Sequence, residues 1–285
     1  MRIEFTKMQG CANDYIYIDC LGAMDFDPSD LSKKMSPRHF SVGADGLVCI
    51  CKSEVADAKM RMFNLDGSEG QMCGNAIRCV GKYLVDSKIC TSKTLKIETL
   101  SGIKTLSDFT FDENGKVDKV TVDMGKASFS PKDIPISQDE EAIEQTMEID
   151  GTKWKFSALS VGNPHCVVVT KSIDVLDLEK IGPKFENNPL FPKRTNTEFV
   201  EVLSNDHLKM RVWERGSGET YACGTGACAS VASCIKNGLC LANSEIKVNL
   251  IGGTLTIKCD DNFNILMTGP AKKIYEGVYF YDVEN

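Results

Sequence analysis

The chain has 285 residues, of which 42% are hydrophobic, so it is long enough to form about two domains with their own apolar cores. A net charge of −7 and the lack of a cluster of Lys and Arg argue against a nucleic-acid-binding surface. No run of 18 apolar residues and no signal-like apolar segment occurs, and the thirteen cysteines are scattered, so we expect a cytoplasmic protein with reduced thiols and no membrane partner.

The first half of the chain has the pattern of short strands around one helix. Strands are predicted at 3–7, 15–19, 47–51 and 58–64, a helix at about 75–85, and further strands at 95–100, 103–111 and 117–123. Ala76, Ile77, Val80 and Leu84 share one face of this helix, which predicts a helix buried against a sheet.

The second half repeats this order of elements. Its helix is predicted at about 225–236, ending at Asn237-Gly238, and strands follow at 246–251, 255–259 and 265–268. A strand-like tail at 274–281 has no expected counterpart in the second half and is predicted to complete the sheet of the first domain. The predicted domains are residues 1–125 with 270–285, and residues 126–269.

A polar, glycine-rich loop occurs twice in the chain, 150 residues apart. Residues 63–75 read FNLDGSEGQMCGN and residues 213–225 read WERGSGETYACGT, so that three positions of the loop match: Glu69 with Glu219, Cys73 with Cys223, and Gly74 with Gly224. Asn13 matches Asn163 and Gly46 matches Asn196 at the same spacing. The repeat predicts an α/β protein of two similar domains, with one thiol from each beside a cleft. The matched Glu69 and Glu219 are expected to have a structural role.

Each repeated loop ends in Cys-Gly directly before a predicted helix. The helix N-terminus favours negative charge, so it lowers the pKa of a nearby thiol and its free amides can bind a carboxylate. Two opposed thiols suit the inversion of a carbon centre, because one group removes a proton from one face while the other delivers a proton to the opposite face. The amides of Gly74, Asn75, Gly224 and Thr225 are the predicted carboxylate site.

The motifs CANDYIYID, FNLDGSEGQMCGNAIRC, VGNPHCV, TNTEFVEV and ERGSGETYACGTGACAS span nearly the whole chain. In this order they resemble the diaminopimelate epimerase family. The resemblance implies two α/β domains, each a mixed sheet around a central helix, with the active site in the cleft between them. It also implies interconversion of LL- and meso-diaminopimelate, an amino-acid substrate, as part of lysine and peptidoglycan precursor biosynthesis, by a homodimer without pyridoxal phosphate, other cofactor or metal.

The resemblance also assigns roles to individual residues. Cys73 and Cys223 are the two acid/base thiols, and His165 and Glu214 assist them. The remaining residues are expected to bind substrate: Gly74, Asn75, Gly224 and Thr225 at the reacting carboxylate, Asn13 near the reacting amine, and Asn64, Asn163, Asn196 and Arg215 at the distal end. Arg215 offers the bidentate fork that suits a carboxylate.

The sequence departs from the common family pattern at three places, one of which is Ala76, where some members have glycine after MCGN. The first motif often reads GxGND, whereas this chain has Cys11 and Ala12 before Asn13. Some members have glutamine where this chain has Gly46, and we therefore expect Gly46→Gln to be tolerated.

Three other functions are alternatives to the epimerase. A related two-thiol racemase would act on another amino acid such as histidine or proline, but three asparagines and the ERGSGET segment fit a substrate with a second polar end better. The sequence gives little support to a non-enzymatic zinc or redox function, because the chain has no CxxC pair and only three histidines. A duplicated domain without catalysis conflicts with retention of both thiols. The asparagines could instead hold turns, and Arg215 with Glu214 could form a surface ion pair.

Overall fold

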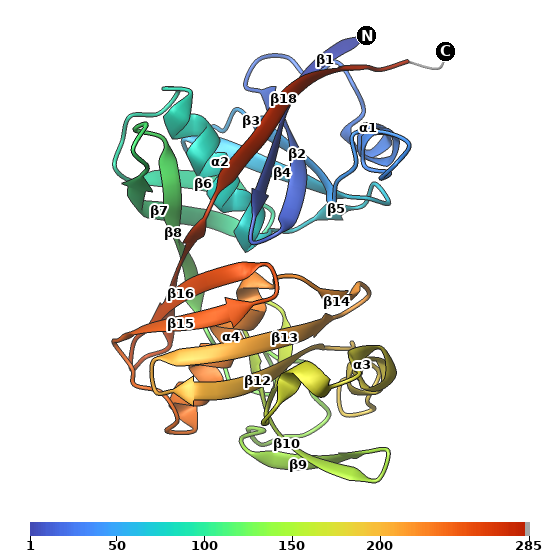
Figure 1. Ribbon diagram of the computed structural model, residues 1–285, viewed down its shortest axis with the longest axis vertical. Coiled ribbons are helices and arrows are strands. Elements are labelled where there is room, and N and C mark those ends of the chain that lie inside the picture. The colour runs from blue at the N-terminus through green and yellow to red at the C-terminus, as the bar shows by residue number, and fades with distance from the viewer. Residues whose placement is uncertain (283–285) are drawn as a thin grey trace. The chain divides into compact units, whose positions relative to one another are not determined.

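The computed structural model describes residues 1–282 and divides into two compact units. Unit 1 comprises Met1–Val122 and the segment from Gly269 onward, and unit 2 comprises Asp123–Thr268. The chain passes from one unit to the other within strands β8 and β17 (Figure 1). Both units are mixed α/β structures built from strands around a central helix.

Unit 1 contains two helices and strands from both ends of the chain. Its elements are β1 (Arg2–Gly10), β2 (Asn13–Cys20), α1 (Pro28–Met35), β3 (Gly46–Cys51), β4 (Ala58–Asn64), β5 (Glu69–Gly70), α2 (Gly74–Asp86), β6 (Leu95–Thr99), β7 (Gly102–Phe111), the first part of β8 (Val117–Lys126) and β18 (Lys272–Phe280).

Unit 2 has the same kind of architecture. Its elements are β9 (Gln145–Ile149), β10 (Thr152–Ser160), β11 (Pro164–Val169), the short 3-10 helix η1 (Ile173–Val175), α3 (Leu178–Glu186), β12 (Asn196–Ser204), β13 (His207–Glu214), β14 (Gly218–Thr220), α4 (Gly224–Lys236), β15 (Glu245–Leu250), β16 (Gly253–Cys259) and most of β17 (Asn264–Pro270).

The duplication is preserved in the pairing of the strands. In the parallel pair β2–β3, Tyr15 lies opposite Gly46, and in the parallel pair β11–β12, His165 lies opposite Asn196. Each member of the second pair stands 150 residues after its counterpart. The antiparallel pairs β3–β4 and β12–β13 follow the same spacing. The repeat is therefore one of structure as well as of sequence.

The spacing changes by one residue after the central helices. The hairpin β6–β7 pairs Thr99 with Gly102, whereas β15–β16 pairs Leu250 with Gly253. The second unit therefore has one extra residue between α4 and β15. This insertion lies beyond the Cys-Gly loops and leaves their register unchanged.

The C-terminal strand β18 pairs with β1 in antiparallel fashion and so belongs to unit 1. The expectation that it has no counterpart in the second half is wrong. Strand β9 lies antiparallel beside β10, the first long strand of unit 2, as β18 lies beside β1. Sequence comparison missed this relationship because β9 precedes its partner along the chain while β18 follows at the far end.

Helices α1 and α3 were not predicted, although they also obey the repeat. Asp27 caps α1 by accepting a hydrogen bond from the Ser29 amide, and Asp177 caps α3 by accepting one from the Lys180 amide. Asp27 and Asp177 stand 150 residues apart, and aspartate is a common N-cap. The helices pack against β3 and β4 in unit 1 and against β12 and β13 in unit 2.

The central helices α2 and α4 are more buried than α1 and α3. Ten of the 13 residues of each helix are buried. In unit 1, α2 packs against β1 and β2, and in unit 2, α4 packs against β10 to β13 and β16 (Figure 1). The sheet around each helix holds its N-terminus in a fixed position. Within residues 1–282, no helix is long and apolar enough to span a membrane.

Candidate active site

Both candidate thiols occupy the N-cap position of a central helix. Cys73 precedes α2 with an extended backbone (φ −131°, ψ 120°), and Cys223 precedes α4 in a similar conformation (φ −114°, ψ 111°). The first backbone amides of a helix have no partner within the helix. The structure therefore brings each predicted thiol to a helix end where amide hydrogens and the helix dipole favour negative charge.

The loop before each thiol is held by an equivalent arginine–glutamate pair. Arg61 donates to both carboxylate oxygens of Glu69 at 2.8 and 2.9 Å, and Arg211 donates to both oxygens of Glu219 at 2.7 and 2.9 Å. These pairs join the strands of the β4–β5 and β13–β14 hairpins. The structural role expected for Glu69 and Glu219 is confirmed, and bidentate geometry makes this brace rigid.

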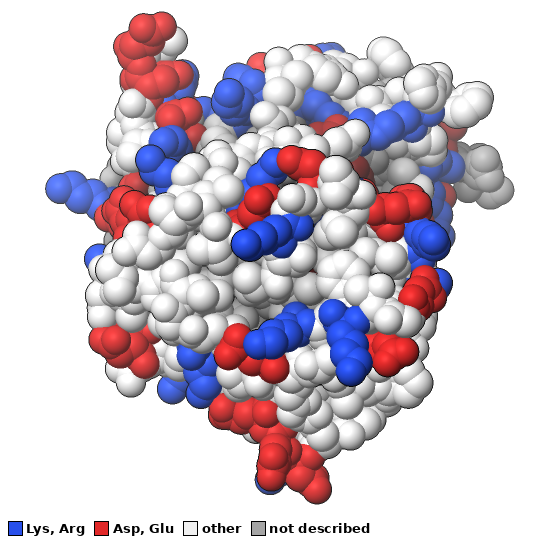
Figure 2. Space-filling view, turned by 60° about the horizontal axis from the view of Figure 1, so that its bottom comes forward, with Lys and Arg blue, Asp and Glu red and all other residues white. Residues whose placement is uncertain are grey.

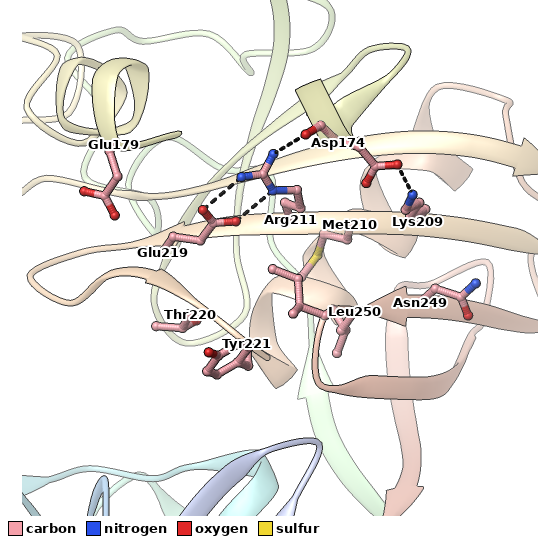
Figure 3. A pocket seen from close by; sticks show the side chains of 11 residues that line it. Asp174, Glu179, Lys209, Met210, Arg211, Glu219, Thr220, Tyr221, Asn249 and Leu250 are labelled. Carbon is pink, nitrogen blue, oxygen red and sulfur yellow. Dashed lines mark hydrogen bonds and ion pairs between the residues drawn. The ribbon is translucent and has the colours of Figure 1, made fainter. Parts of the chain in front are cut away.

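A pocket of about 510 Å³ lies over the brace of unit 2. Figure 3 shows Arg211 between Glu219 and Asp174, with Lys209 bound to the Asp174 carboxylate. None of the predicted site residues lines this pocket. Its lining includes both residues of the brace, so it belongs to the support of the loop.

In unit 1, the Cys73 thiol donates a hydrogen bond to Asn13 Oδ1 at 3.2 Å. The amide nitrogen of Asn13 in turn donates to Asp45 Oδ2 at 2.8 Å, and the same oxygen accepts the backbone amide of Asp14. The bond to Asp45 thus holds Asn13 in place while its oxygen contacts the Cys73 thiol. Asn13, which is assigned to substrate, is thus a hydrogen-bond partner of Cys73.

Beneath the start of α2 lies an arginine that the sequence did not single out. Arg78 is fully buried, and its guanidinium donates to Gly74 O at 3.0 Å, to Asn75 Oδ1 at 2.9 Å and to Pro270 O at 3.2 Å. It fixes the predicted carboxylate-binding residues Gly74 and Asn75 from below. Its position at the fourth residue after Gly74, on the buried helix face, was the available signal, because an arginine is seldom fully buried without partners.

In unit 2, Cys223 is 6% exposed and its sulfur has partners from the first turn of α4. The Gly226 amide donates to Sγ at 3.3 Å, and Thr225 Oγ1 lies 3.5 Å from Sγ. Burial, followed by the negative charges of Glu214 and Glu198, raises the pKa of the Cys223 thiol well above its ordinary value. The expectation that the helix end lowers the pKa of this thiol is therefore wrong for Cys223. Cys223 is accordingly a protonated thiol at neutral pH, suited to the role of acid.

Glu214 stands at the end of β13 and faces the Cys223 side chain. Thr220 Oγ1 donates a hydrogen bond to Glu214 Oε1. Burial raises the pKa of Glu214 above its ordinary value, and the charge of Glu198 adds to this effect. The carboxyl therefore takes up a proton more readily than an exposed glutamate does. The reading of Glu214 with Arg215 as a surface ion pair is not what the structure shows, because their side chains bind different partners.

His165 is fully buried on β11 and has a partner at each ring nitrogen. Nδ1 lies 2.7 Å from Glu198 Oε1, and Nε2 lies 3.0 Å from Asn163 Oδ1. Asn163 Nδ2 continues the chain with a 3.4 Å hydrogen bond to Thr225 Oγ1. These side chains link β11, β12 and the start of α4 and reach Cys223 through Thr225.

The remaining predicted binding residues have structural bonds of their own. Asn196 Nδ2 donates to Pro164 O at 2.9 Å, and its Oδ1 accepts the Arg215 amide at 3.0 Å. Arg215 is exposed and donates from its guanidinium to Lys193 O at 3.1 Å. Asn64 is exposed in the loop of unit 1 and donates to Ser68 Oγ at 2.9 Å. Each asparagine thus shapes the loop in which it stands.

Gly46 occupies a position with no room for a side chain. A Cβ atom built there would lie 2.1 Å from Phe63 O and 2.9 Å from a ring carbon of Tyr15. The expectation that glutamine is tolerated at this position is therefore wrong. The reason is the close approach of β4 to β3, where Phe63 is the neighbour of the residue that pairs with Gly46.

Together these residues form two thiol sites of similar backbone and different surroundings. Each places a sulfur where helix amides can receive a carboxylate, and unit 2 adds two carboxyl groups and an imidazole. On the face shown in Figure 2, Lys and Arg side chains are interspersed with Asp and Glu. The chemistry that this arrangement can perform is proton transfer to and from a substrate carbon next to a carboxylate.

Comparison with known sequences gives one family over most of the chain. The sequence model described as Diaminopimelate epimerase matches residues 5–130 and 157–274. A diaminopimelate epimerase of Acetivibrio thermocellus is 52% identical over 277 residues, covering 96% of this chain and 98% of that protein. One from Desulfovibrio desulfuricans is 47% identical over 286 residues, with 98% of each covered. One from Methanococcus maripaludis is 48% identical over 277 residues, covering 96% and 99%.

Solved structures with the same fold are more distant in sequence. A phenazine biosynthesis protein of the PhzF family from Bacillus anthracis matches with a TM-score of 0.72 and 20% identity, over 99% of this chain and all of that one. A hydroxyproline epimerase from Agrobacterium vitis, with bound trans-4-hydroxy-L-proline, matches with a TM-score of 0.69 and 13% identity, over 98% and 91%. At these identities the likeness concerns the fold, which confirms the predicted two-domain α/β class.

Proposed function

The chain belongs to the diaminopimelate epimerase family and has the function of an amino-acid epimerase acting on diaminopimelate; from this premise we propose that Cys73 and Cys223 perform the reaction as a pair of acid/base groups. In the proposed reaction, one sulfur takes the α-proton from one face of the substrate carbon. The other delivers a proton to the opposite face, which interconverts the LL and meso forms. The roles exchange when the reaction runs in the other direction.

The observation that carries this proposal is the placement of the two thiols. Cys73 and Cys223 each cap a central helix at the same position of a duplicated unit. The mechanism requires both sulfurs to reach one α-carbon. The amides after each cysteine supply the positive end of a helix dipole, which stabilises the negative charge that develops toward the carboxylate during proton removal.

The groups around Cys223 support a start of the reaction in which the two thiols differ in protonation. Glu214 faces Cys223, and burial raises the pKa values of both. Cys223 accordingly begins as the proton donor, and its donation leaves a thiolate that can take the α-proton in the reverse direction. Between turnovers, Glu214 can return a proton to this sulfur while Cys73 releases its own to solvent. In this scheme the protein itself supplies every proton-transfer group, and the proposal includes no pyridoxal phosphate, other cofactor or metal.

We assign the distal amino-acid end of the substrate to Asn64, Asn163, Asn196 and Arg215. Three of these four have side-chain bonds that leave further hydrogen-bonding capacity, since an amide has two donors and an oxygen with two lone pairs. A racemase for proline or histidine is the alternative. It is favoured only by distant structures that share the fold, and those neighbours are at most 20% identical to this chain.

The family also suggests the oligomeric state, the compartment and the partners of the enzyme. We propose a homodimer that acts in the cytoplasm in lysine and peptidoglycan precursor biosynthesis, with a small amino acid as its ligand and neither nucleic acid nor membrane as a partner. All thirteen cysteines are free thiols, which supports a reducing compartment. Ile274, Val278 and Phe280 of β18 are 54%, 38% and 75% exposed, and they offer an apolar surface for a second copy.

The test is exchange of the substrate α-hydrogen with deuterated water. The protein is incubated separately with LL-diaminopimelate, meso-diaminopimelate, histidine and proline, and deuterium at the α-carbon is measured by mass spectrometry. We expect both diaminopimelate isomers to exchange, with kcat/KM on the order of 10⁴ above the other amino acids, because a shorter substrate leaves buried polar groups unpaired. Comparable values for histidine or proline would contradict the assignment.

A further inference from the structure

Glu198 is a buried carboxylate in unit 2 to which the proposed mechanism gives no role. It lies on β12, and its side chain and that of His165 are both 0% exposed. Glu198 Oε1 lies 2.7 Å from His165 Nδ1, while Oε2 is buried without a hydrogen-bond partner. A buried carboxylate with one free oxygen is costly to fold, so its presence points to a use other than stability.

The carboxylate also lies against the first turn of α4. A Cβ atom built on Gly226 would lie 2.6 Å from Glu198 Oε1 and 3.2 Å from the Cys223 Cβ. Glycine at this position lets Glu198 approach the turn that carries the thiol. The amide of Gly226 is the group that donates to Cys223 Sγ. Glu198 and Cys223 therefore both lie next to Gly226.

The hydrogen bonds of His165 determine where its ring carries a proton. The carboxylate at Nδ1 is an acceptor, so Nδ1 must bear hydrogen whichever way the Asn163 amide is oriented. With Asn163 Oδ1 toward Nε2, Nε2 donates as well. With the amide reversed, Nε2 accepts and the ring is neutral. Glu198 fixes the ring orientation in both cases.

The charge of Glu198 also acts on the groups around the thiol. Three titratable side chains face this part of unit 2: Glu198 from β12, Glu214 from β13 and His165 from β11. After burial, the charge of Glu214 and then that of Glu198 raise the pKa of Cys223, and Glu198 likewise raises the pKa of Glu214. Removing the negative charge of Glu198 should therefore make Cys223 easier to ionise.

We propose that Glu198 is a positioning residue for the Cys223 half of the reaction, holding His165 by Nδ1 and placing a negative charge against the turn of α4 that carries the thiol. The inference rests on the proposed function, in which Cys223 is one of the two proton-transfer groups. In this proposal Glu198 bonds to neither the thiol nor the substrate. Its effect passes through its charge and through the linked side chains of His165, Asn163 and Thr225.

Two substitutions at Glu198 separate the effect of its charge from the effect of its hydrogen bond to His165. Glu198→Gln keeps the length and an oxygen for Nδ1 but removes the charge, whereas Glu198→Asp keeps the charge and draws it away from His165. The matched control is Glu201→Gln, which removes a partly buried charge from the opposite face of the same strand. For each protein, the rate of Cys223 alkylation by iodoacetamide is followed against pH by peptide mapping, together with epimerisation in both directions.

For Glu198→Gln we expect the midpoint of Cys223 alkylation to fall by about one pH unit, with epimerisation reduced on the order of 10–100-fold. Glu198→Asp should lose activity with the alkylation midpoint unchanged, and Glu201→Gln should match the parent protein in both measurements. An unchanged alkylation midpoint in Glu198→Gln overturns the proposal. A purely structural role would lower activity or yield without moving that midpoint.

A second measurement uses the unmodified protein, in case Glu198→Gln does not fold. The chain has three histidines, so ¹⁵N-labelled histidine gives few signals, and His165→Gln identifies the one of interest. We expect a protonated Nδ1 at His165, and a ring with hydrogen only at Nε2 would overturn the proposal. Full epimerisation by Cys223→Ser would instead defeat the two-thiol function, while the alkylation and histidine results would still stand as measurements of Glu198.

Discussion

The two thiol regions share a backbone and differ in the side chains placed on it. Cys73 and Cys223 cap helices of equal length, and each loop is braced by an arginine–glutamate pair. Yet at positions 150 residues apart, unit 1 and unit 2 carry different residues: Tyr15 and His165, Val48 and Glu198, Asn64 and Glu214, Arg78 and Cys228. His165, Glu198 and Glu214 thus have uncharged counterparts in unit 1, whereas the buried Arg78 of unit 1 corresponds to Cys228 in unit 2.

The two units thus share the backbone position of the thiol, whereas the side chains that control its proton affinity differ between them. Two sulfurs in identical surroundings would have the same affinity for a proton. An epimerase of the proposed kind needs one thiolate and one thiol at the start of each turnover. Burial, followed by the charges of Glu214 and Glu198, raises the pKa of Cys223 and so favours the thiol form of this sulfur.

The largest expected effect comes from removing either sulfur. Cys73→Ala and Cys223→Ala should each abolish epimerisation, because no other group replaces the lost acid or base. Cys73→Ser and Cys223→Ser should leave at most weak activity, since a hydroxyl is far less acidic than a thiol. If the two sites work on opposite faces, the serine variants will differ in which stereoisomer exchanges its α-hydrogen in deuterated water. Full activity of the double alanine variant would remove the mechanism.

The next effect concerns Gly46 and its counterpart Asn196, where the two units differ in available space. Gly46→Gln and Gly46→Asn should destabilise unit 1 by about 3 kcal/mol or more, because the new Cβ meets a backbone oxygen that cannot move without breaking the β3–β4 pairing. Urea unfolding measures the loss. Gly22→Gln serves as the matched control, since a Cβ atom built on Gly22 meets nothing within 4 Å. A normal unfolding midpoint for Gly46→Gln would show that β3 and β4 can separate at this point.

A smaller, pH-dependent effect is expected at Glu214, whose counterpart Asn64 cannot ionise. The raised pKa of Glu214 means that the folded protein holds this proton more tightly than the unfolded chain does. The stability that Glu214 contributes is complete below its unfolded pKa, ordinarily 4.5, and is lost as pH rises through the higher folded pKa. Glu214→Gln should lack this loss. The free energies of unfolding of the two proteins, measured across that window, should shift in favour of the variant as pH increases.

The opposite order, with the parent protein gaining on Glu214→Gln as pH rises, would mean that the folded structure favours the ionised carboxylate. The control is Glu201→Gln, for which no such pH-dependent difference is expected. Activity is measured in parallel, because Glu214 is assigned to proton transfer with Cys223 and its loss should reduce epimerisation whatever happens to stability.

The smallest effect concerns the tight turn before Asn13. Cys11 and Ala12 have positive φ angles of 54° and 64°, whereas Gly162, the counterpart of Ala12, has a φ of 84°. Alanine is strained in this conformation and glycine is not, so Ala12→Gly should stabilise the protein by about 0.5–1 kcal/mol. Thermal unfolding measures the gain. A lower melting temperature would show that the alanine side chain makes contacts that outweigh its backbone strain.

Much of the architecture could be predicted from the sequence because it depends on local pattern. Alternating apolar residues located the strands of unit 1, and the helical spacing of Ala76, Ile77, Val80 and Leu84 located α2 to within one residue of its start. The repeated Cys-Gly step placed both thiols at helix ends. Helices α1 and α3 escaped because they are short, and their signal was a single capping aspartate in each.

Only the tertiary structure decided the surroundings of the thiols. Glu198 stands 25 residues before Cys223, and nothing in its neighbours TNTEFVEV marks it as the partner of His165; the parallel pairing of β11 with β12 brings them together. Arg78 likewise gains its meaning from Pro270, nearly 200 residues away. The crowding at Gly46 comes from a neighbouring strand. Sequence periodicity reports which face of an element is buried, whereas the identity of the atoms across that face depends on long-range pairing that no local pattern records.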